Sequence, residues 1–312
     1  MTISHHSHSG QFCRHAKGTL EEVVEEAIRQ GFTTFGLSEH VPRYKKEHFY
    51  PEEADLSVQD LSDTFEAYLV EAHRLKELNK HRIELLVGLE TEYIDDEGLD
   101  RLEQLLEKHG NAIEYLVGSV HHCDSLPIDF DKERYEACLA GQPGSTERER
   151  FSSLFCTYFD NQYTLLKRLQ PEVLGHIDLC RLYFPDTDFA SFPEVWQRIE
   201  RNVDFATSYG ALFEVNASAF RKGWRTAYPG SDVFDLILRK EGRFTLSDDS
   251  HGPQAVGLHY DQAYRYLDER RLDTLWRLER PKDGSASPFR RGCVPAAIDG
   301  QPWLQGWASK QN

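Results

Sequence analysis

The chain has 312 residues and a formal net charge of −16, from 36 lysines and arginines against 52 aspartates and glutamates. So acidic a chain gains no affinity by releasing counterions from a phosphate backbone, which excludes general nucleic-acid binding. Hydrophobic residues make up 39% of the sequence, which suffices for a packed core, and no apolar run approaches the roughly 20 residues that cross a bilayer. The first residues, MTISHHSHSG, lack the features of a secretory signal. We therefore expect a soluble, cytoplasmic protein that binds neither membranes nor nucleic acid.

Short apolar runs alternate with amphipathic segments along most of the chain. Strands are expected over residues 2–6, 33–40, 82–90, 114–122, 171–176, 211–218 and 243–251. Helices are expected over residues 19–30, 58–79, 99–109, 150–169, 193–208, 232–240 and 261–277. The first helix begins with a capping box formed by Thr19 and Glu22, and Gly31 marks its end.

Strands that alternate with helices run parallel, and a closed or nearly closed α/β barrel is an economical way to arrange seven of them. An open doubly wound sheet is the alternative, but such a sheet normally carries a glycine-rich phosphate loop after its first strand, and this sequence has none there. We therefore predict a barrel over residues 1–280. Residues 281–312 are rich in glycine, serine and proline, and we expect them to form a loosely packed tail.

Polar side chains that can bind metals lie where each expected strand ends. They are His6, Ser7 and His8; Glu39 and His40; Glu90; His121 and His122; His176; Glu214 and Asn216; and Asp249, Ser250 and His251. In a parallel barrel the carboxyl ends of all strands meet at one face, which carries the chemistry. The pairs His6–His8 and Asp249–His251 each have the spacing that puts two side chains on the same side of a strand. Each pair can therefore chelate one ion.

The residue types at these strand ends predict the kind of metal and the kind of reaction. Six cysteines are scattered without a C-x-x-C pair, and Cys13, Cys123 and Cys180 are expected to pack near the site without binding metal. Imidazole and carboxylate ligands without sulfur favour Zn, Fe or Mn. Together with His15, nine ligands are available, too many for one tetrahedral ion. We therefore predict two or three divalent ions, which would generate hydroxide for a hydrolysis.

The remaining histidines are not expected to bind metal. His122 follows His121 directly and should point the other way, so His121 is expected to be the ligand and His122 a neighbouring or substrate-binding residue. The histidines at positions 5, 48, 73, 81, 109 and 259 are expected on the surface.

Seven segments in order, HSHSG, SEHVPR, GLETEY, GSVHH, GHIDL, EVNASAFRK and SDDSHG, resemble the motifs of the PHP (polymerase and histidinol phosphatase) superfamily. Over about residues 4–275 the chain is most similar to the fungal-type histidinol-phosphate phosphatases of this superfamily. The stretches YPEEADL and LPIDFD, which lie outside the shared metal motifs, also resemble those enzymes. The resemblance implies a distorted (β/α)7 TIM-like barrel, the PHP fold, with a trinuclear metal site.

The resemblance also implies how the metal ligands are shared among three ions. The first ion would be held by His6, His8 and Asp249, the second by His121 and His176, and the third by His15, His40 and His251, with Glu90 bridging the first two. Asp249, His251 and Glu90 are therefore expected to be catalytic as well. Glu92 lies further beyond its strand and is a weaker alternative to Glu90.

The reaction implied by the resemblance is hydrolysis of L-histidinol phosphate to L-histidinol and phosphate, in L-histidine biosynthesis. A metal-bridging hydroxide would attack phosphorus in line, without a phospho-enzyme. Arg181, Arg221 and Arg43 are candidates for binding the phosphate, because a guanidinium can donate to two oxygens at once. Asp178 and Glu214 are candidates for binding the ammonium and imidazole groups of the substrate.

Three alternative functions remain open at this point. A PHP-type phosphoesterase acting on another small phosphate ester would have the same metal ligands. A metal-dependent amidohydrolase also uses an H-x-H motif, but often has a carbamylated lysine at a strand end where this chain has Glu90. A non-catalytic metal-binding module would be expected to have lost ligands, whereas all nine positions are filled here.

Overall fold

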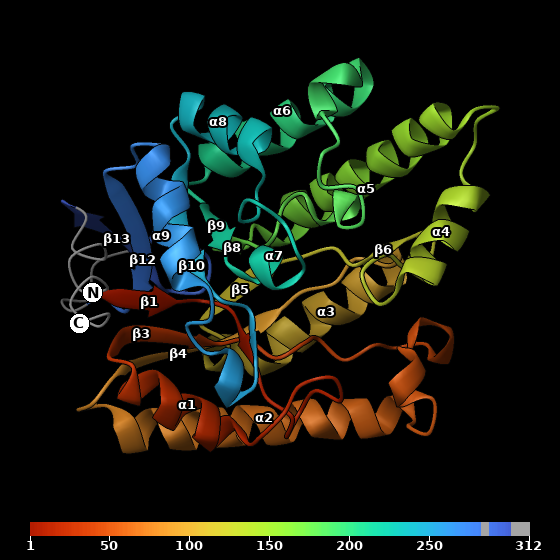
Figure 1. Ribbon diagram of the computed structural model, residues 1–312. Coiled ribbons are helices and arrows are strands. Elements are labelled where there is room, and N and C mark those ends of the chain that lie inside the picture. Colours follow the sequence, from red (N-terminus) through yellow and green to blue (C-terminus); the bar gives the residue numbers. More distant parts are fainter. Residues whose placement is uncertain (282–286, 301–312) are drawn as a thin grey trace.

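The computed structural model describes residues 1–281 and 287–300. Seven parallel strands form a nearly closed barrel, which confirms the predicted architecture (Figure 1). Their order is β1 (Thr2–Ser4), β3 (Phe32–Leu37), β4 (Glu84–Glu90), β5 (Tyr115–Gly118), β8 (Val173–Leu174), β9 (Leu212–Asn216) and β10 (Arg243–Ser247). All seven coincide with predicted strands, but most end earlier than predicted. Most of the polar motif residues therefore follow the strands on loops at one end of the barrel.

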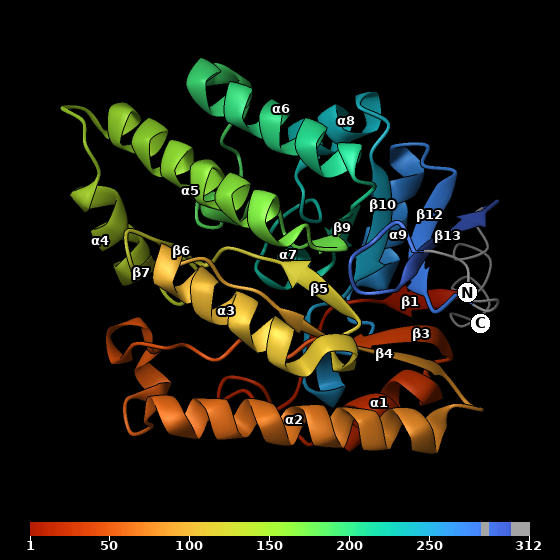
Figure 2. The same ribbon diagram turned by 180° about the vertical axis from the view of Figure 1, so that it is seen from behind.

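Helices cover the outside of the barrel, as both views show (Figures 1 and 2). They are α1 (Leu20–Arg29), α2 (Val58–Asn79), α3 (Asp96–His109), α5 (Glu147–Leu169), α6 (Pro193–Ser208), α8 (Ser231–Arg239) and α9 (Tyr260–Glu269). The capping box of α1 is present, because Thr19 and Glu22 each accept a hydrogen bond from the other's backbone N–H. Leu20, Val23 and Ala27 of this helix are fully buried, so its apolar face packs against the barrel.

The chain after α9 differs from the prediction. The helix expected over residues 261–277 ends at Glu269, and Thr274–Glu279 form strand β12 instead. Arg271 adopts a left-handed φ of 54°, which breaks the helix even though apolar residues continue at helical spacing. A helix that was not predicted, α4 (Lys132–Gly141), lies before α5.

Part of the expected loose tail is an ordered strand. β13 (Val294–Asp299) pairs antiparallel with β12. Phe289 and Cys293 are buried in one cluster with Leu278 of β12 and with residues of the barrel interior. In Figures 1 and 2 this hairpin lies beside the amino-terminal end of β1. It therefore closes the end of the barrel opposite to the polar motifs, while residues 282–286 and 301–312 of the expected tail lie outside the described residues.

The barrel interior is filled by large side chains. Tyr115 is fully buried there, and its hydroxyl donates a hydrogen bond to the carbonyl oxygen of His5 at 2.8 Å. Two glycines make room for this ring: a β-carbon on Gly88 would lie 2.5 Å from a ring carbon, and one on Gly36 would lie 2.2 Å from the hydroxyl oxygen. Neither glycine can therefore be replaced without displacing Tyr115.

Two histidines expected on the surface are buried instead. His5 is 0% exposed, its Nδ1 lies 3.1 Å from Thr245 Oγ1, and its Nε2 accepts a hydrogen bond from the Leu278 N–H at 3.0 Å. His5 therefore links β10 to β12 inside the protein. His48 is buried as well. Among the others, His81 is exposed and His73, His109 and His259 are half-buried.

The barrel closes between its first and last strands at the end that carries the motifs. Ser4 Oγ, at the end of β1, donates a hydrogen bond to Asp248 Oδ1 at 2.8 Å, just beyond β10. Past this point β2 (Ser7–His8) pairs in parallel with β11 (Ser250–His251). The two motifs with H-x-H and D-x-H spacing thus lie side by side. Within the described residues, no helix has the length and apolar character needed to span a bilayer.

Candidate metal centre and active site

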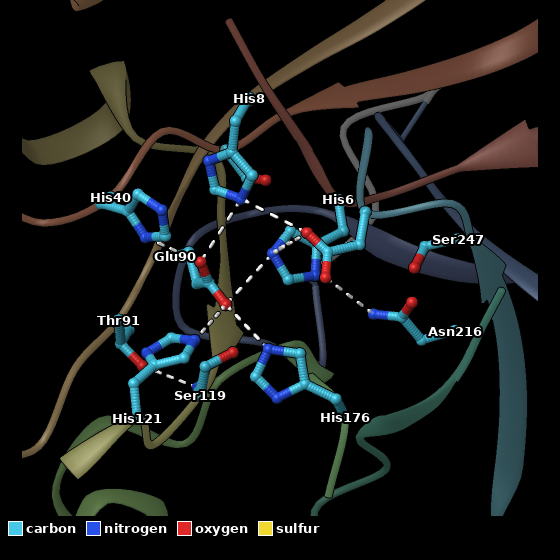
Figure 3. A network of polar contacts seen from close by, with 12 residues as sticks. His6, His8, His40, Glu90, Thr91, Ser119, His121, His176, Asn216 and Ser247 are labelled. Atoms are coloured by element: carbon cyan, nitrogen blue, oxygen red, sulfur yellow. Dashed lines mark hydrogen bonds and ion pairs between the residues drawn. The ribbon is translucent and has the colours of Figure 1, made fainter. Parts of the chain in front are cut away.

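Glu90, the last residue of β4, lies at the centre of a cluster of imidazoles (Figure 3). Five histidine nitrogens lie near its carboxylate. Three of them face Oε1: Nε2 of His6 at 3.1 Å, of His121 at 3.2 Å and of His176 at 3.2 Å. Two face Oε2: Nδ1 of His40 at 2.8 Å and Nε2 of His8 at 3.4 Å. Both oxygens of one carboxylate thus face imidazoles. This is the arrangement that a bridging ligand between two ions requires.

Asp249 provides a second carboxylate to the cluster. Its Oδ1 lies 3.6 Å from Nε2 of both His6 and His8. Its Oδ2 is within 3.3 Å of donors from Asn216 and Ser218, so the carboxylate is held in one orientation. Asp249 has a positive φ of 47°, a backbone conformation that is uncommon for residues other than glycine.

Several of the histidines are held by carboxylates through their second ring nitrogen. The pairs are His6 Nδ1 with Glu214 at 2.8 Å, His121 Nδ1 with Glu92 at 2.8 Å, and His15 Nδ1 with Glu52 at 2.9 Å. A histidine fixed in this way presents its other nitrogen to a metal ion. Glu214 therefore contacts His6 and not the substrate, contrary to the prediction. Glu92 contacts Nδ1 of His121, whereas both oxygens of Glu90 face imidazoles of the cluster.

Five groups of side chains in the described residues have ligand atoms within 4.8 Å of one another. They are His6, His8 and Glu90; His6, His176 and Asp249; His8, Asp249 and His251; Glu90, His121 and His176; and Cys13, His15, His40 and His251. All nine predicted ligands belong to these groups. So does Cys13, whose Sγ lies 3.1 Å from His15 Nε2. Cys13 was expected to pack near the site without binding metal, but it lies within reach of an ion.

Unpaired ring nitrogens show that divalent metal ions fit this cluster. Both ring nitrogens of His8, Nε2 of His6 and Nε2 of His40 are buried and form no hydrogen bond among the described residues, although those of His6 and His8 lie 3.1 to 3.6 Å from carboxylate oxygens. Burying such groups without a partner is unfavourable. Metal ions at these positions would satisfy them, and imidazole with carboxylate is a ligand set that divalent ions prefer.

The protonation of the cluster is set by opposing effects. Burial favours the neutral form of Glu90, but the surrounding histidines hold its pKa well below the usual range. Burial alone would lower the pKa of His6, but the neighbouring carboxylates raise it well above 6.5. Burial and the charge of His8 lower the pKa of His40 and of His251. Protons on His6 thus compensate the carboxylates, and bound ions would replace them.

The cluster opens into a cavity of about 420 Å³, a suitable size for a small molecule. Three cationic residues line it: Lys17, Arg221 and Lys222. None of them forms an ion pair with a carboxylate of the described residues. Arg221, one of the three arginines predicted to bind phosphate, thus lines the cavity, and the two lysines are further cations that the motifs did not indicate.

Arg181 lies elsewhere. It is 2% exposed, and its N–H groups donate to Asp178, to Asp232 and to the carbonyl oxygen of Thr187 at distances of 2.6 to 3.0 Å. Neither Arg181 nor Asp178 lines the cavity. Both are committed to a buried ion pair and are not free to bind a substrate, contrary to the prediction.

Arg43 and His122 lie behind one wall of the cavity. Arg43 is 7% exposed, forms an ion pair with Glu53, and packs on the ring of Tyr50 at 4.6 Å. The His122 ring lies 5.6 Å from that of Tyr50, and its Nδ1 lies 3.2 Å from Glu92. Arg43 and His122 were predicted to bind the substrate, but neither residue lines the cavity.

The wall itself consists of residues that no motif singled out. Tyr50, Asp129 and Phe130 line the cavity, and Tyr50 stacks on Phe130 with ring centroids 5.7 Å apart. They come from the stretches YPEEADL and LPIDFD, which lie outside the metal motifs. The signal that could have found them was the resemblance of these two stretches to the fungal enzymes.

Residues 4–218 match the PHP domain family. Over 297 residues the chain is 46% identical to a probable histidinol-phosphatase of Schizosaccharomyces pombe, with 94% of this chain and 95% of that protein covered. It is 30% identical to the histidinol-phosphatase of Saccharomyces cerevisiae over 310 residues, with 88% of this chain and 91% of that protein covered. Its fold is similar to that of a Lactococcus lactis histidinol phosphate phosphatase solved with zinc, L-histidinol and phosphate (TM-score 0.63, 19% identity, 86% and 93% covered). The chain belongs to the PHP family.

Proposed function

We propose that this protein is a phosphoric monoester hydrolase that converts L-histidinol phosphate to L-histidinol and phosphate in L-histidine biosynthesis. The observation that carries the proposal is the complete set of nine ligands beside a cavity with unpaired cations. The names of the two fungal relatives support the choice of substrate. Such a biosynthetic reaction takes place in the cytoplasm.

The nine ligands would hold two or three divalent ions, with zinc, iron and manganese as the alternatives. The groups around Glu90 support the first two ions, and His15, His40 and His251 support a third. When bound, such ions supply a hydroxide near neutral pH and neutralise charge on phosphoryl oxygens. The zinc in the Lactococcus lactis structure is consistent with this choice of metals.

The side chains of the cavity divide the remaining work. Arg221, Lys17 and Lys222 have no carboxylate partner among the described residues, so their charges attract a phosphate group and hold it beside the ligands. Arg221 Nη2 lies 3.5 Å from the carbonyl oxygen of Asp249, which places the guanidinium next to the cluster. Glu90 and Asp249 provide fixed negative charge at the centre of the cluster.

Phosphate release from L-histidinol phosphate tests the proposal, run beside nucleotides and sugar phosphates, with and without a chelator. We expect a preference for L-histidinol phosphate of roughly 100-fold in kcat/KM. A site that hydrogen-bonds particular groups of its substrate rejects ligands that lack those same groups. The chelator should abolish the activity, and adding back single metals should identify the ion. Activity on other esters alone would show that L-histidinol phosphate is not the substrate. Metal binding without hydrolysis of any ester would indicate a non-catalytic metal-binding module.

A further inference from the structure

Asp129 has a buried carboxylate oxygen with no partner. The residue lies between β7 (Leu126–Pro127) and α4 and lines the cavity. Its Oδ1 is buried and accepts no hydrogen bond, and the carboxylate forms no ion pair with a described residue. It belongs to none of the groups that could hold a metal ion. Because a buried carboxylate without a donor is costly, its place in a cavity indicates that a ligand supplies the donor.

The surroundings of Asp129 suit a flat organic group. Phe130 follows it, is 38% exposed, and stacks on Tyr50 with an interplanar angle of 21°. Both rings line the same cavity, so a planar heterocycle can pack against them. Burial raises the pKa of Tyr50 well above 10, and the negative charge of Asp129 raises it further, so Tyr50 is neutral.

The cavity is therefore lined by groups of both charges. Arg221, Lys17 and Lys222 carry unpaired positive charge, and Arg221 contacts Asp249. Asp129 carries unpaired negative charge and lies with Tyr50 and Phe130. A ligand with an anionic phosphate, a cationic amine and a flat ring complements the cations, the carboxylate and the two aromatic rings.

We infer that Asp129 determines specificity by accepting hydrogen bonds from the protonated amino group of the substrate, while the imidazole ring packs against Tyr50 and Phe130. This inference rests on the proposed function, since it assigns one end of the same substrate. It replaces the expectation that Asp178 or Glu214 binds the amine, because those carboxylates are paired with Arg181 and His6.

The test compares Asp129→Asn with the unaltered protein on two esters, L-histidinol phosphate and the deamino analogue that lacks only the amino group. Removing the charge should lower kcat/KM for L-histidinol phosphate by about 10- to 100-fold, mostly through KM, as loss of a charged hydrogen bond predicts. For the deamino analogue kcat/KM should stay within about twofold. Inhibition by L-histidinol should weaken by a factor similar to the loss of kcat/KM for L-histidinol phosphate. Inhibition by inorganic phosphate should not change.

Glu133→Gln is the matched control, because it removes one negative charge from an exposed position on α4. It should leave kcat/KM unchanged for both esters. Asp129→Glu keeps the charge and should retain part of the discrimination, which covers the case that Asp129→Asn fails to fold. Equal losses on both esters, or no loss on either, would overturn the inference while leaving the proposed function intact. Failure of the unaltered protein to hydrolyse L-histidinol phosphate would instead overturn the proposed function.

Discussion

Glu92 shows how one carboxylate can position a ligand without belonging to the ligand set. It accepts a hydrogen bond from the backbone N–H of His121 at 3.0 Å, and its other oxygen lies 2.8 Å from His121 Nδ1. The main chain and the ring of His121 are thus fixed by the same side chain. Burial opposes ionisation of Glu92, but His121 and His122 hold its pKa well below the usual range. The charged form is therefore the one that positions the imidazole.

Replacing Glu92 with Gln should lower the affinity for the ion held by His121 by about 10- to 100-fold, because the ring loses the carboxylate that fixes it. Activity should fall when metal is limiting and return when metal is in excess. Competition with a chelator of known affinity measures the effect. Glu77→Gln, at an exposed position on α2, is the control, and equal affinities for both variants would show that Glu92 does not position His121.

At the same scale, Arg181 and Arg221 show what a sequence can and cannot indicate about a side chain. Each follows a metal motif closely, and both were expected to bind phosphate. Arg221 lines the cavity, whereas Arg181 is enclosed by Asp178 and by Asp232 from α8. The distance of an arginine from a motif is visible in the sequence. The carboxylate that reaches it from a distant helix is not.

At the scale of elements, Gly88 and Tyr115 show that two neighbouring strands are matched in shape. Gly88→Ala should destabilise the protein by about 1 to 3 kcal/mol, because the new methyl group would overlap the Tyr115 ring. Urea unfolding measures the change. Gly141→Ala is the control, since a β-carbon there meets no atom within 4 Å, and its effect should be near zero. A neutral Gly88→Ala would mean that the interior is less tightly packed than described.

His5 makes the link between β10 and β12 sensitive to pH. Burial lowers its pKa from 6.5 to about 4. Between these values the unfolded chain binds a proton that the folded chain does not, so stability falls as the pH drops below 6.5. From pH 7 to pH 5 this one group should cost about 2 kcal/mol.

The effect can be isolated with His5→Gln, which keeps an acceptor for the Leu278 N–H but does not titrate. In chelator, to remove any effect of metal release, urea unfolding at pH 7 and pH 5 should show a smaller loss of stability for the variant than for the unaltered protein. Parallel losses in the two proteins would mean that His5 is not the titrating group.

The elements that were predicted correctly are those whose local pattern agrees with their surroundings. In α1 the capping box and the buried apolar face both indicate a helix, and the structure has one. Residues 274–277 were expected to belong to the last helix, but pairing with β13 makes Thr274–Glu279 a strand. Pairing with a later segment is a tertiary effect that local periodicity does not contain. The unpredicted burial of His5 has the same cause, since Leu278 of β12 covers it.

At the scale of the whole molecule, the ligand cluster joins the carboxyl ends of strands from the start to the end of the barrel. Removing metal should therefore lower the stability of the entire barrel. An ion present at 1,000 times its dissociation constant contributes about 4 kcal/mol per site. Urea unfolding with and without chelator should show a lower midpoint for the metal-free protein. An unchanged midpoint would mean that the described ligands bind no ion under those conditions.

The pairing of β2 with β11 has a consequence for synthesis. His8 and His251 are more than two hundred residues apart in the sequence, and His8 is synthesised first. A nascent chain that has not yet exposed residue 251 lacks both Asp249 and the strand that lies beside His8, so it cannot complete the cluster. A chain terminated before residue 249 would therefore lack part of the ligand set, whereas the ligands from His6 to His176 would already be present.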